Sequence, residues 1–351
     1  MKGGFMLLLM NRKVRVVLGL MLPVITVSAC VDVTEFDMTY DSGLSVISPV
    51  DLSLVASFPD MINPRCIMLY PGTVFAASTE GTVYRFDAES YTLTGEYNVG
   101  VSSPAGYTQM VFSPVENTAY IIGSMGRLLE LSIPECQVID EFTLCSSPVE
   151  MAVTAGVLGY LWVVDGTSNT VYQVDIGTNQ SHHSISFPGY CTIKCIEPSG
   201  YYQDSLLVGT SLITYKLEAL SEGGIRATYV PDLFQSCVSL CSIPYDSNFV
   251  AVVGNYPYVI GELCAYDDSF YIDPPPRFYN TDQLTGDNVI TAAANDYKHV
   301  YALSYLGDGV SRLSSYSYIA PYGINGYADF QGYPVDMKVS ESGNIYVLTY
   351  E

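Results

Sequence analysis

Positively charged residues are scarce in this chain. Of its 351 residues only 14 are Lys or Arg, against 36 Asp or Glu, which gives a formal net charge of -22. A surface this acidic repels both nucleic acids and anionic membrane faces. We therefore expect no nucleic-acid partner. The acidity serves either solubility outside the cytoplasm or the recruitment of a cationic partner.

Histidine is rare as well, and no catalytic motif is present. The chain has only 3 His residues, and we expect His182, His183 and His299 to be solvated or structural. The sequence has no Ser nucleophile elbow, no Gly-rich phosphate loop and no zinc-protease helix motif. We therefore predict no catalytic residue and no cofactor, and we favour a non-enzymatic protein.

The N-terminal apolar run is too short to cross a membrane. Residues 16–27 fall below the roughly 20 residues that a spanning helix needs. A basic cluster at residues 12–15 precedes the run, and Ser28 and Ala29 follow it. This order is typical of a signal peptide, so we leave residues 1–29 out of the fold.

The sequence VSAC at residues 27–30 resembles the lipobox of bacterial lipoproteins. The resemblance implies that residues 1–29 are removed and that Cys30 carries a diacylglyceryl group and an amide-linked acyl chain such as palmitate. Two or three acyl chains anchor a protein stably where one does not. The resemblance thus implies a lipid-anchored protein of the bacterial cell envelope that faces the periplasm or the exterior. An ordinary secretory signal or an uncleaved anchor is the alternative.

A β-hairpin pattern recurs along the rest of the chain. Residues 161–180 contain an apolar run, a turn around Gly166 and Asn169, and a second run with alternating apolar positions. The pattern returns at residues 74–89 and, in weaker form, at residues 120–133 and 206–217. A period of about 40 residues with four strands per repeat indicates an all-β protein, a β-propeller of four-stranded blades.

Seven inner strands can be aligned, which predicts a seven-bladed propeller; six or eight blades would each require one miscounted strand. The last inner strand leaves room for only one more strand before the chain ends. The missing strands of that blade must then come from the N-terminus, at residues 34–40 and 52–58, which would close the ring. We expect residues 30–50 to form a tether and possible closure strand, and residues 51–351 to form the propeller. The aligned segments begin at residues 65, 109, 150, 192, 238, 289 and 336.

Two segments resemble known propeller repeats. Residues 161–175 resemble the YVTN repeat, in which an apolar strand leads through a Gly/Asn turn to a strand that ends in Asp. Residues 81–87, GTVYRFD, resemble the quinoprotein-type repeat of propeller lipoproteins in the outer-membrane assembly machinery. These resemblances imply binding scaffolds, surface-layer components or enzymes, so the fold does not fix the function.

A metal-dependent hydrolase or lyase is the alternative to a binding role. Lactonase-like and lyase-like propellers hold a divalent ion near the ends of their inner strands through acidic, Asn or His side chains. A resemblance to them would make the following residues candidate ligands: Glu150, Glu197, Asp287, Asn288 and Asp336.

Cysteines pair up along two neighbouring repeats. Cys191 and Cys195 in one repeat match Cys237 and Cys241 in the next. Four residues of a strand span about 13 Å, which excludes a disulfide within either pair if both segments are strands. A bond between repeats, for instance Cys191 with Cys237, is compatible with an oxidising compartment. Otherwise these cysteines serve as small buried hydrophobes.

Tyrosine is abundant, with 30 residues, many of them in the long fifth repeat and near the C-terminus. Long aromatic loops on a rigid propeller are suited to recognition, although the same tyrosines could pack between blades. The leading interpretation is a lipid-anchored, non-catalytic binding or scaffold module with a protein or glycan partner in the cell envelope. The candidate binding residues are Tyr256, Tyr258, Tyr266, Tyr271, Tyr322 and Tyr327.

Overall fold

The described chain consists of β-sheets. The computed structural model describes residues 43–58, 61, 63–100, 109–123, 126–156, 159–199, 204–220, 223–230, 236–242, 249–253, 256–260, 262–266, 269–273, 277–278, 289–294, 299–317, 323–340 and 342–350. These residues form seven four-stranded sheets and one two-stranded sheet, all with antiparallel pairing. The predicted all-β fold of four-stranded blades is confirmed.

Six of the sheets are built from consecutive stretches of the chain, and we number them blades 1 to 6. Blade 1 contains β3 (Pro64–Tyr70), β4 (Thr73–Ser78), β5 (Thr82–Asp87) and β6 (Thr92–Asn98), and blade 2 contains β7 (Met110–Ser113), β8 (Thr118–Ile122), β9 (Arg127–Ser132) and β10 (Val138–Thr143). Blade 3 contains β11 (Pro148–Thr154), β12 (Tyr160–Asp165), β13 (Thr170–Asp175) and β14 (Gln180–Ser186), and blade 4 contains β15 (Ile193–Pro198), β16 (Ser205–Thr210), β17 (Thr214–Ala219) and β18 (Ile225–Tyr229). Blade 5 contains β19 (Cys237–Ser242), β20 (Phe249–Val253), β21 (Tyr256–Ile260) and β24 (Arg277–Phe278), and blade 6 contains β25 (Val289–Ala294), β26 (His299–Gly307), β27 (Val310–Ser317) and β28 (Gly323–Gln331).

Blade 7 combines both ends of the described chain. Its strand order is β2 (Leu54–Phe58), β1 (Gly43–Ile47), β30 (Ile345–Tyr350) and β29 (Tyr333–Val339). Strand β1 pairs with β30 from Gly43 opposite Thr349 to Ile47 opposite Ile345. The outermost strand is therefore the one predicted at residues 52–58. The strand beside β30 is Gly43–Ile47 rather than residues 34–40, which lie outside the described part of the chain.

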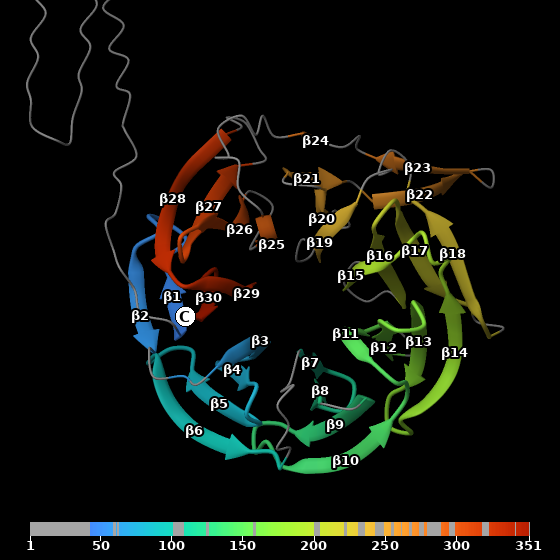
Figure 1. Cartoon of the computed structure of the whole chain (residues 1–351), viewed down its shortest axis with the longest axis horizontal. Coiled ribbons are helices and arrows are strands. Elements are labelled where there is room, and N and C mark those ends of the chain that lie inside the picture. Colours follow the sequence, from blue (N-terminus) through green and yellow to red (C-terminus); the bar gives the residue numbers. More distant parts are fainter. Residues whose placement is uncertain are drawn as a thin grey trace, which may run out of the picture.

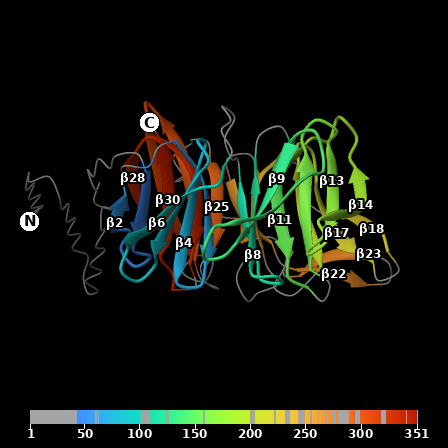
Figure 2. The same ribbon diagram turned by 90° about the horizontal axis from the view of Figure 1, so that it is seen from below.

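The seven blades surround a common axis (Figure 1). Each inner strand contacts the inner strand of the next blade in the order β3, β7, β11, β15, β19, β25 and β29, and β29 contacts β3 in turn. In the side view the strands run roughly along the axis (Figure 2). The inner strands therefore all begin at the same face of the ring.

The core lies between neighbouring blades. The middle strands β8, β12 and β16 are buried along their whole length, because each of their two faces packs against another blade. Trp162 in β12 is fully buried, and its indole N–H donates to the Thr154 hydroxyl at 3.1 Å. The outer strands β6 and β14 are mostly exposed. Continuous apolar runs in the middle strands and polar outer strands thus follow from the position of each strand in its blade.

Blade 5 carries the long insertion that lengthens its repeat. The hairpin of β22 (Glu262–Tyr266) and β23 (Ser269–Asp273) is a separate two-stranded sheet, inserted between β21 and the short outer strand β24. It lies at the periphery of the ring beside blade 4 (Figure 1). Within the described residues, no helix has the length and apolar character that a membrane span requires.

The mixed blade generates a stability prediction. Leu44 in β1 is fully buried, whereas Val50 just after β1 is 91% exposed. We expect Leu44→Ala to lower the free energy of unfolding by about 2 to 5 kcal/mol, because the cavity opens between blade 1 and blade 7, the blade that joins the two ends of the chain. Val50→Ala is the control and should change it by less than about 0.5 kcal/mol. Chemical denaturation of both variants is the measurement, and equal, small effects would contradict the role of β1.

Candidate functional site at the propeller axis

A β-bulge interrupts six of the seven inner strands at the same point. In each case the inner strand contains one unpaired extra residue. The residues before and after it pair with two adjacent residues of the second strand of the blade. Bulges re-aim side chains and are common next to functional sites. We call the six extra residues the bulge ring: Arg65, Val149, Lys194, Val238, Ile290 and Val335.

The bulge ring is mostly apolar and open to solvent. Val149 is 47% exposed, and Val238 and Ile290 are each 38% exposed. Arg65 and Lys194 are exposed too, so the ring brings two cations to one face of an acidic protein. A single exposed apolar residue needs no explanation, but a repeated set around one axis is the kind of surface that marks an interaction site.

The residue after each bulge points at the next blade. The Asp336 carboxylate accepts a hydrogen bond from the backbone N–H of Ile67 at 2.8 Å, which links blade 7 to blade 1. The Gln109 side-chain oxygen, at the equivalent place in blade 2, accepts from the N–H of Met151 in blade 3. The polar groups at this level of the axis therefore join the blades.

Two glutamates extend this set of inter-blade hydrogen bonds. Glu150 of blade 3 accepts from the backbone N–H of Ile196 in blade 4. Glu197, two residues beyond the equivalent position in blade 4, accepts from the N–H of Ser242 in blade 5 at 3.0 Å. Between blades 5 and 6 the hydroxyls of Ser239 and Thr291 lie 3.3 Å apart.

The charges of the same acids act on one lysine. Lys338 lies two residues after Asp336 and therefore projects from the same side of β29. The charges of Asp336, Glu197 and Glu150 raise the pKa of Lys338 to about 12, and partial desolvation near the axis opposes the shift although the Lys338 side chain remains exposed. Glu150, Glu197, Asp336 and Lys338 thus form an axial cluster supplied by blades 3, 4 and 7.

Burial dominates the titration of the two glutamates. It raises the pKa of Glu150 from 4.5 to about 8, against the N–H of Ile196 and the charge of Lys338, which favour the ionised form. Burial also raises the pKa of Glu197, opposed by Lys338 and by the hydrogen bond from Ser242. Near neutral pH Glu150 is therefore largely protonated while Lys338 stays charged. Glu150 and Lys338 together could hold a polar ligand or transfer a proton.

The predicted metal ligands are only partly brought together. Glu150, Glu197 and Asp336 share the axial cluster, whereas Asp287 and Asn288 lie outside the described residues. Across the ranges that the structure describes, no group of three His, Cys, Asp or Glu residues is arranged to hold a metal ion. Lys338 was missed at the sequence level, although its spacing from Asp336 was a usable signal.

The candidate binding tyrosines are spread over two blades and an insertion. Tyr256 and Tyr258 are strand residues of β21, and Tyr266 and Tyr271 belong to the hairpin β22–β23. Tyr322 lies outside the described residues. Tyr327 in β28 is half-buried, with the guanidinium of Arg312 4.0 Å from its ring centre. Their role in binding stays a prediction.

The histidines lie away from the axis. His182 and His183 are in the outer strand β14, where the His182 ring is 3.5 Å from the Asp175 carboxylate and stacks on Tyr160. His299 begins β26 and stacks on Tyr301. These positions belong to blade packing and the blade surface rather than to the axial cluster.

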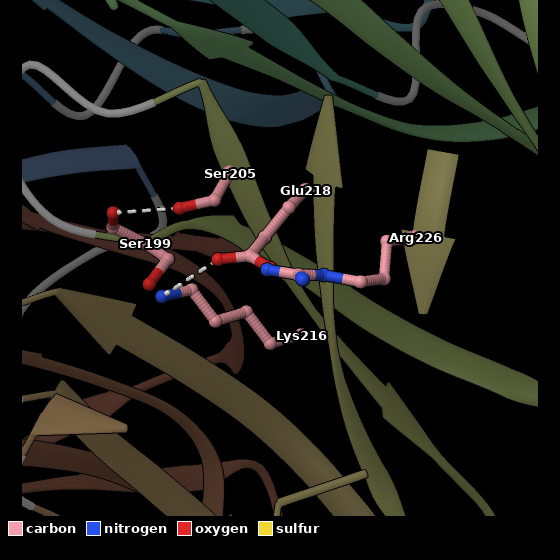
Figure 3. A network of polar contacts seen from close by, with 5 residues as sticks. All are labelled: Ser199, Ser205, Lys216, Glu218 and Arg226. Atoms are coloured by element: carbon pink, nitrogen blue, oxygen red, sulfur yellow. Dashed lines mark hydrogen bonds and ion pairs between the residues drawn. The ribbon is translucent and has the colours of Figure 1, made fainter. Parts of the chain in front are cut away.

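Blade 4 holds a second polar group, shown in Figure 3. The ammonium of the buried Lys216 is 3.5 Å from the Glu218 carboxylate, which also accepts from the Arg226 Nε at 2.8 Å. Glu218 and Arg226 face each other on β17 and β18. Nearby, the Ser205 hydroxyl donates to the carbonyl of Ser199 at 3.3 Å. A buried lysine needs such a partner, so we assign this group to blade stability.

Comparisons with known proteins identify the fold. No protein-family model matches the chain, and no curated protein matches its sequence. The solved structure of RRP9 WD40 repeats is similar with a TM-score of 0.62 at 10% identity, over 88% of this chain and 98% of that one. Virginiamycin B lyase from Staphylococcus aureus is similar with a TM-score of 0.57 at 13% identity, over 82% of this chain and 95% of that one. A structure of streptogramin B lyase is similar with a TM-score of 0.57 at 13% identity, over 88% and 97%. At these identities the likeness establishes a β-propeller and no function.

The raised pKa of Glu150 generates a pH prediction. The pKa of Glu150 in the folded state, about 8, lies above its ordinary value of 4.5. The contribution of Glu150 to the free energy of unfolding is therefore greatest below pH 4.5 and is lost as pH rises through 8. Glu150→Gln removes this titration but keeps the acceptor for Ile196, as Gln109 does for Met151. We expect the variant to exceed the wild type by about 1 to 3 kcal/mol at pH 9 and to match it near pH 5.

The controls separate charge from hydrogen bonding. Glu150→Ala should be less stable than the wild type at pH 5, because the N–H of Ile196 loses its acceptor. Glu96→Gln, at an exposed position of β6, should leave the pH profile unchanged. Thermal unfolding between pH 5 and pH 9 is the measurement. Parallel profiles for the wild type and Glu150→Gln would contradict the assignment.

Proposed function

We propose that this protein is a lipid-anchored binding module of the bacterial cell envelope, and that the bulge ring is its docking surface for a protein partner. The observation that carries the proposal is the repeated exposure of Val149, Val238 and Ile290 at one face of the ring. An exposed bulge residue is free to be polar at no cost in folding. Apolar residues at the same point of blades 3, 5 and 6 therefore favour contact with another molecule.

The chemistry of the ring favours a protein over a glycan. Its apolar members are aliphatic, while Arg65 and Lys194 supply the two cations. A buried apolar centre with an Arg at its border is typical of protein interfaces. The complementary surface is an apolar segment with acidic flanks, which the two cations would attract in preference to a cationic one.

The axial cluster supports a non-catalytic role. The carboxylates of Glu150, Glu197 and Asp336 each accept a backbone N–H of the next blade, and Lys338 balances part of their charge. These acids are thus engaged in holding the ring together. The fold itself is compatible with either role, since WD40 repeats and a lyase are both among its structural neighbours.

Site-specific photocrosslinking tests the docking surface. A photoreactive amino acid at Val149, which is 47% exposed, should crosslink to a discrete protein in intact cells. The matched control is Leu93 in the outer strand β6, which is 45% exposed and should give no such product. The second ring position, Val238, should capture the same protein. Equal crosslinking at Leu93, or none at both ring positions, would overturn the proposal.

The anchor is tested on Cys30. We expect the mature N-terminal peptide to begin at Cys30 with acyl mass attached, and the protein to partition into the detergent phase. Cys30→Ala should leave the full-length precursor without acyl mass, because the lipobox loses its acceptor sulfur. An unmodified Cys30 in the mature protein would remove the anchor from the proposal.

A metal-dependent hydrolase or lyase is the second candidate, because carboxyl groups of three blades, Glu150, Glu197 and Asp336, all act electrostatically on Lys338 near the axis. Elemental analysis of the soluble domain from Val31 onward, purified without chelator, decides between the two. The binding module predicts no tightly bound divalent ion after weakly bound ions are washed away. About one ion per chain that is lost in Glu197→Gln would favour the enzyme.

A further inference from the structure

Two buried cysteines from neighbouring blades lie side by side. Cys195 follows the bulge of β15 in blade 4, and Cys237 begins β19 in blade 5. Their sulfur atoms are 3.9 Å apart, and the two residues are 6% and 0% exposed. A disulfide requires a sulfur–sulfur distance of about 2.05 Å, so rotation of the two side chains must bring the sulfurs about 2 Å closer.

A glycine of blade 4 leaves room for this contact. Gly209 in β16 lies opposite Cys195, and a Cβ at position 209 would be 2.5 Å from the Cys195 sulfur and 2.9 Å from the Cys237 sulfur. Any side chain at 209 would therefore displace one thiol. The absence of a side chain at this strand position is what lets the two sulfurs meet.

The other described cysteines are placed differently. The Cys191 sulfur lies 3.0 Å from the Thr210 hydroxyl. The sulfur in contact with Cys237 is that of Cys195, so the candidate disulfide is Cys195 with Cys237 and not, as the sequence suggested, Cys191 with Cys237. Cys66, Cys136 and Cys145 are buried without a disulfide partner among the described residues. The geometry thus selects one pair.

We propose that Cys195 and Cys237 form a disulfide that ties blade 4 to blade 5 in the exported protein. This inference rests on the proposed location, because a disulfide persists in the envelope and not in the cytoplasm. The bond would close a loop of the chain between residues 42 positions apart. A covalent link over such a loop stabilises the fold mainly by restricting the unfolded chain.

The oxidant is a protein or small-molecule disulfide, such as oxidised glutathione. The thiolate of one cysteine attacks the oxidant's disulfide and expels one thiolate, and the second cysteine then attacks the mixed disulfide and expels the other. The protein loses two protons and two electrons, and the oxidant is reduced to two thiols. Burial and the contact with Cys237 hold the pKa of Cys195 well above its usual range in the folded state. The bond therefore forms during folding, before blades 4 and 5 close on the pair.

Refolding tests the pair itself. The full chain is refolded with and without oxidised glutathione, alkylated in acid, and digested without reduction. We expect a Cys195 peptide linked to a Cys237 peptide and a Tm several degrees above that of the reduced protein. Adding the oxidant only after folding should give the link much more slowly. Unlinked Cys195 and Cys237 after oxidative refolding, or Cys237 linked to Cys191, would overturn the proposal.

Matched variants keep the result interpretable if one substitution impairs folding. Cys195→Ser and Cys237→Ser should each abolish the link and the dependence of Tm on the oxidant. Cys145→Ser, at a buried cysteine outside the pair, should retain both. Protein isolated from the envelope and alkylated at once tests the location separately. Free thiols there, after the link has formed on refolding, would contradict the proposed location rather than the pairing.

Discussion

The ring depends on hydrogen bonds that pass, at several junctions between blades, from a side chain of one inner strand to the backbone of the next. Blades are separate sheets, and side-chain packing alone would let neighbouring inner strands slide. The contacts of Asp336 with Ile67, Glu150 with Ile196, and Glu197 with Ser242 fix the register between blades near the axis. Because these acceptors are charged or titratable, the same constraint makes the stability of the ring sensitive to pH.

Much of the fold could be predicted from local patterns. The turn around Gly166 and Asn169 and the apolar run of β12 identify a hairpin without further information. The short last repeat also requires outer strands from the N-terminus. The position of β1 could not be derived, because residues 34–40 and 43–47 both carry β-prone residues, and only pairing with β30 distinguishes them.

The site was harder to predict, for a physical reason. From the sequence alone, acidic residues on inner strands cannot be distinguished from metal ligands, because both are Asp or Glu. Only the three-dimensional structure shows that Glu150 and Asp336 accept backbone hydrogen bonds from other blades. The bulge ring leaves almost no trace in the sequence, since one extra residue per strand is visible only from strand pairing. The contact of Cys195 with Cys237 likewise depends on which blades are adjacent.

The axial cluster and the bulge ring thus have different roles. The axial cluster and its hydrogen bonds hold the ring in register, and the bulge ring, which precedes these residues by one or three positions along each strand, is mostly exposed. This arrangement can be explained without a reaction at the axis. It also explains why acidic residues lie near the axis beside the bulge ring, which is mostly apolar and carries two cations.

The central claim is that the axial acids are committed to backbone hydrogen bonds. Residue-resolved amide hydrogen exchange at Ile67, Ile196 and Ser242, with and without a saturating divalent cation, tests it most directly. The account predicts strong protection of all three amides and no change when the cation is added. Rapid exchange at these amides, or protection that the cation removes, would show that the acids are free to serve another ligand.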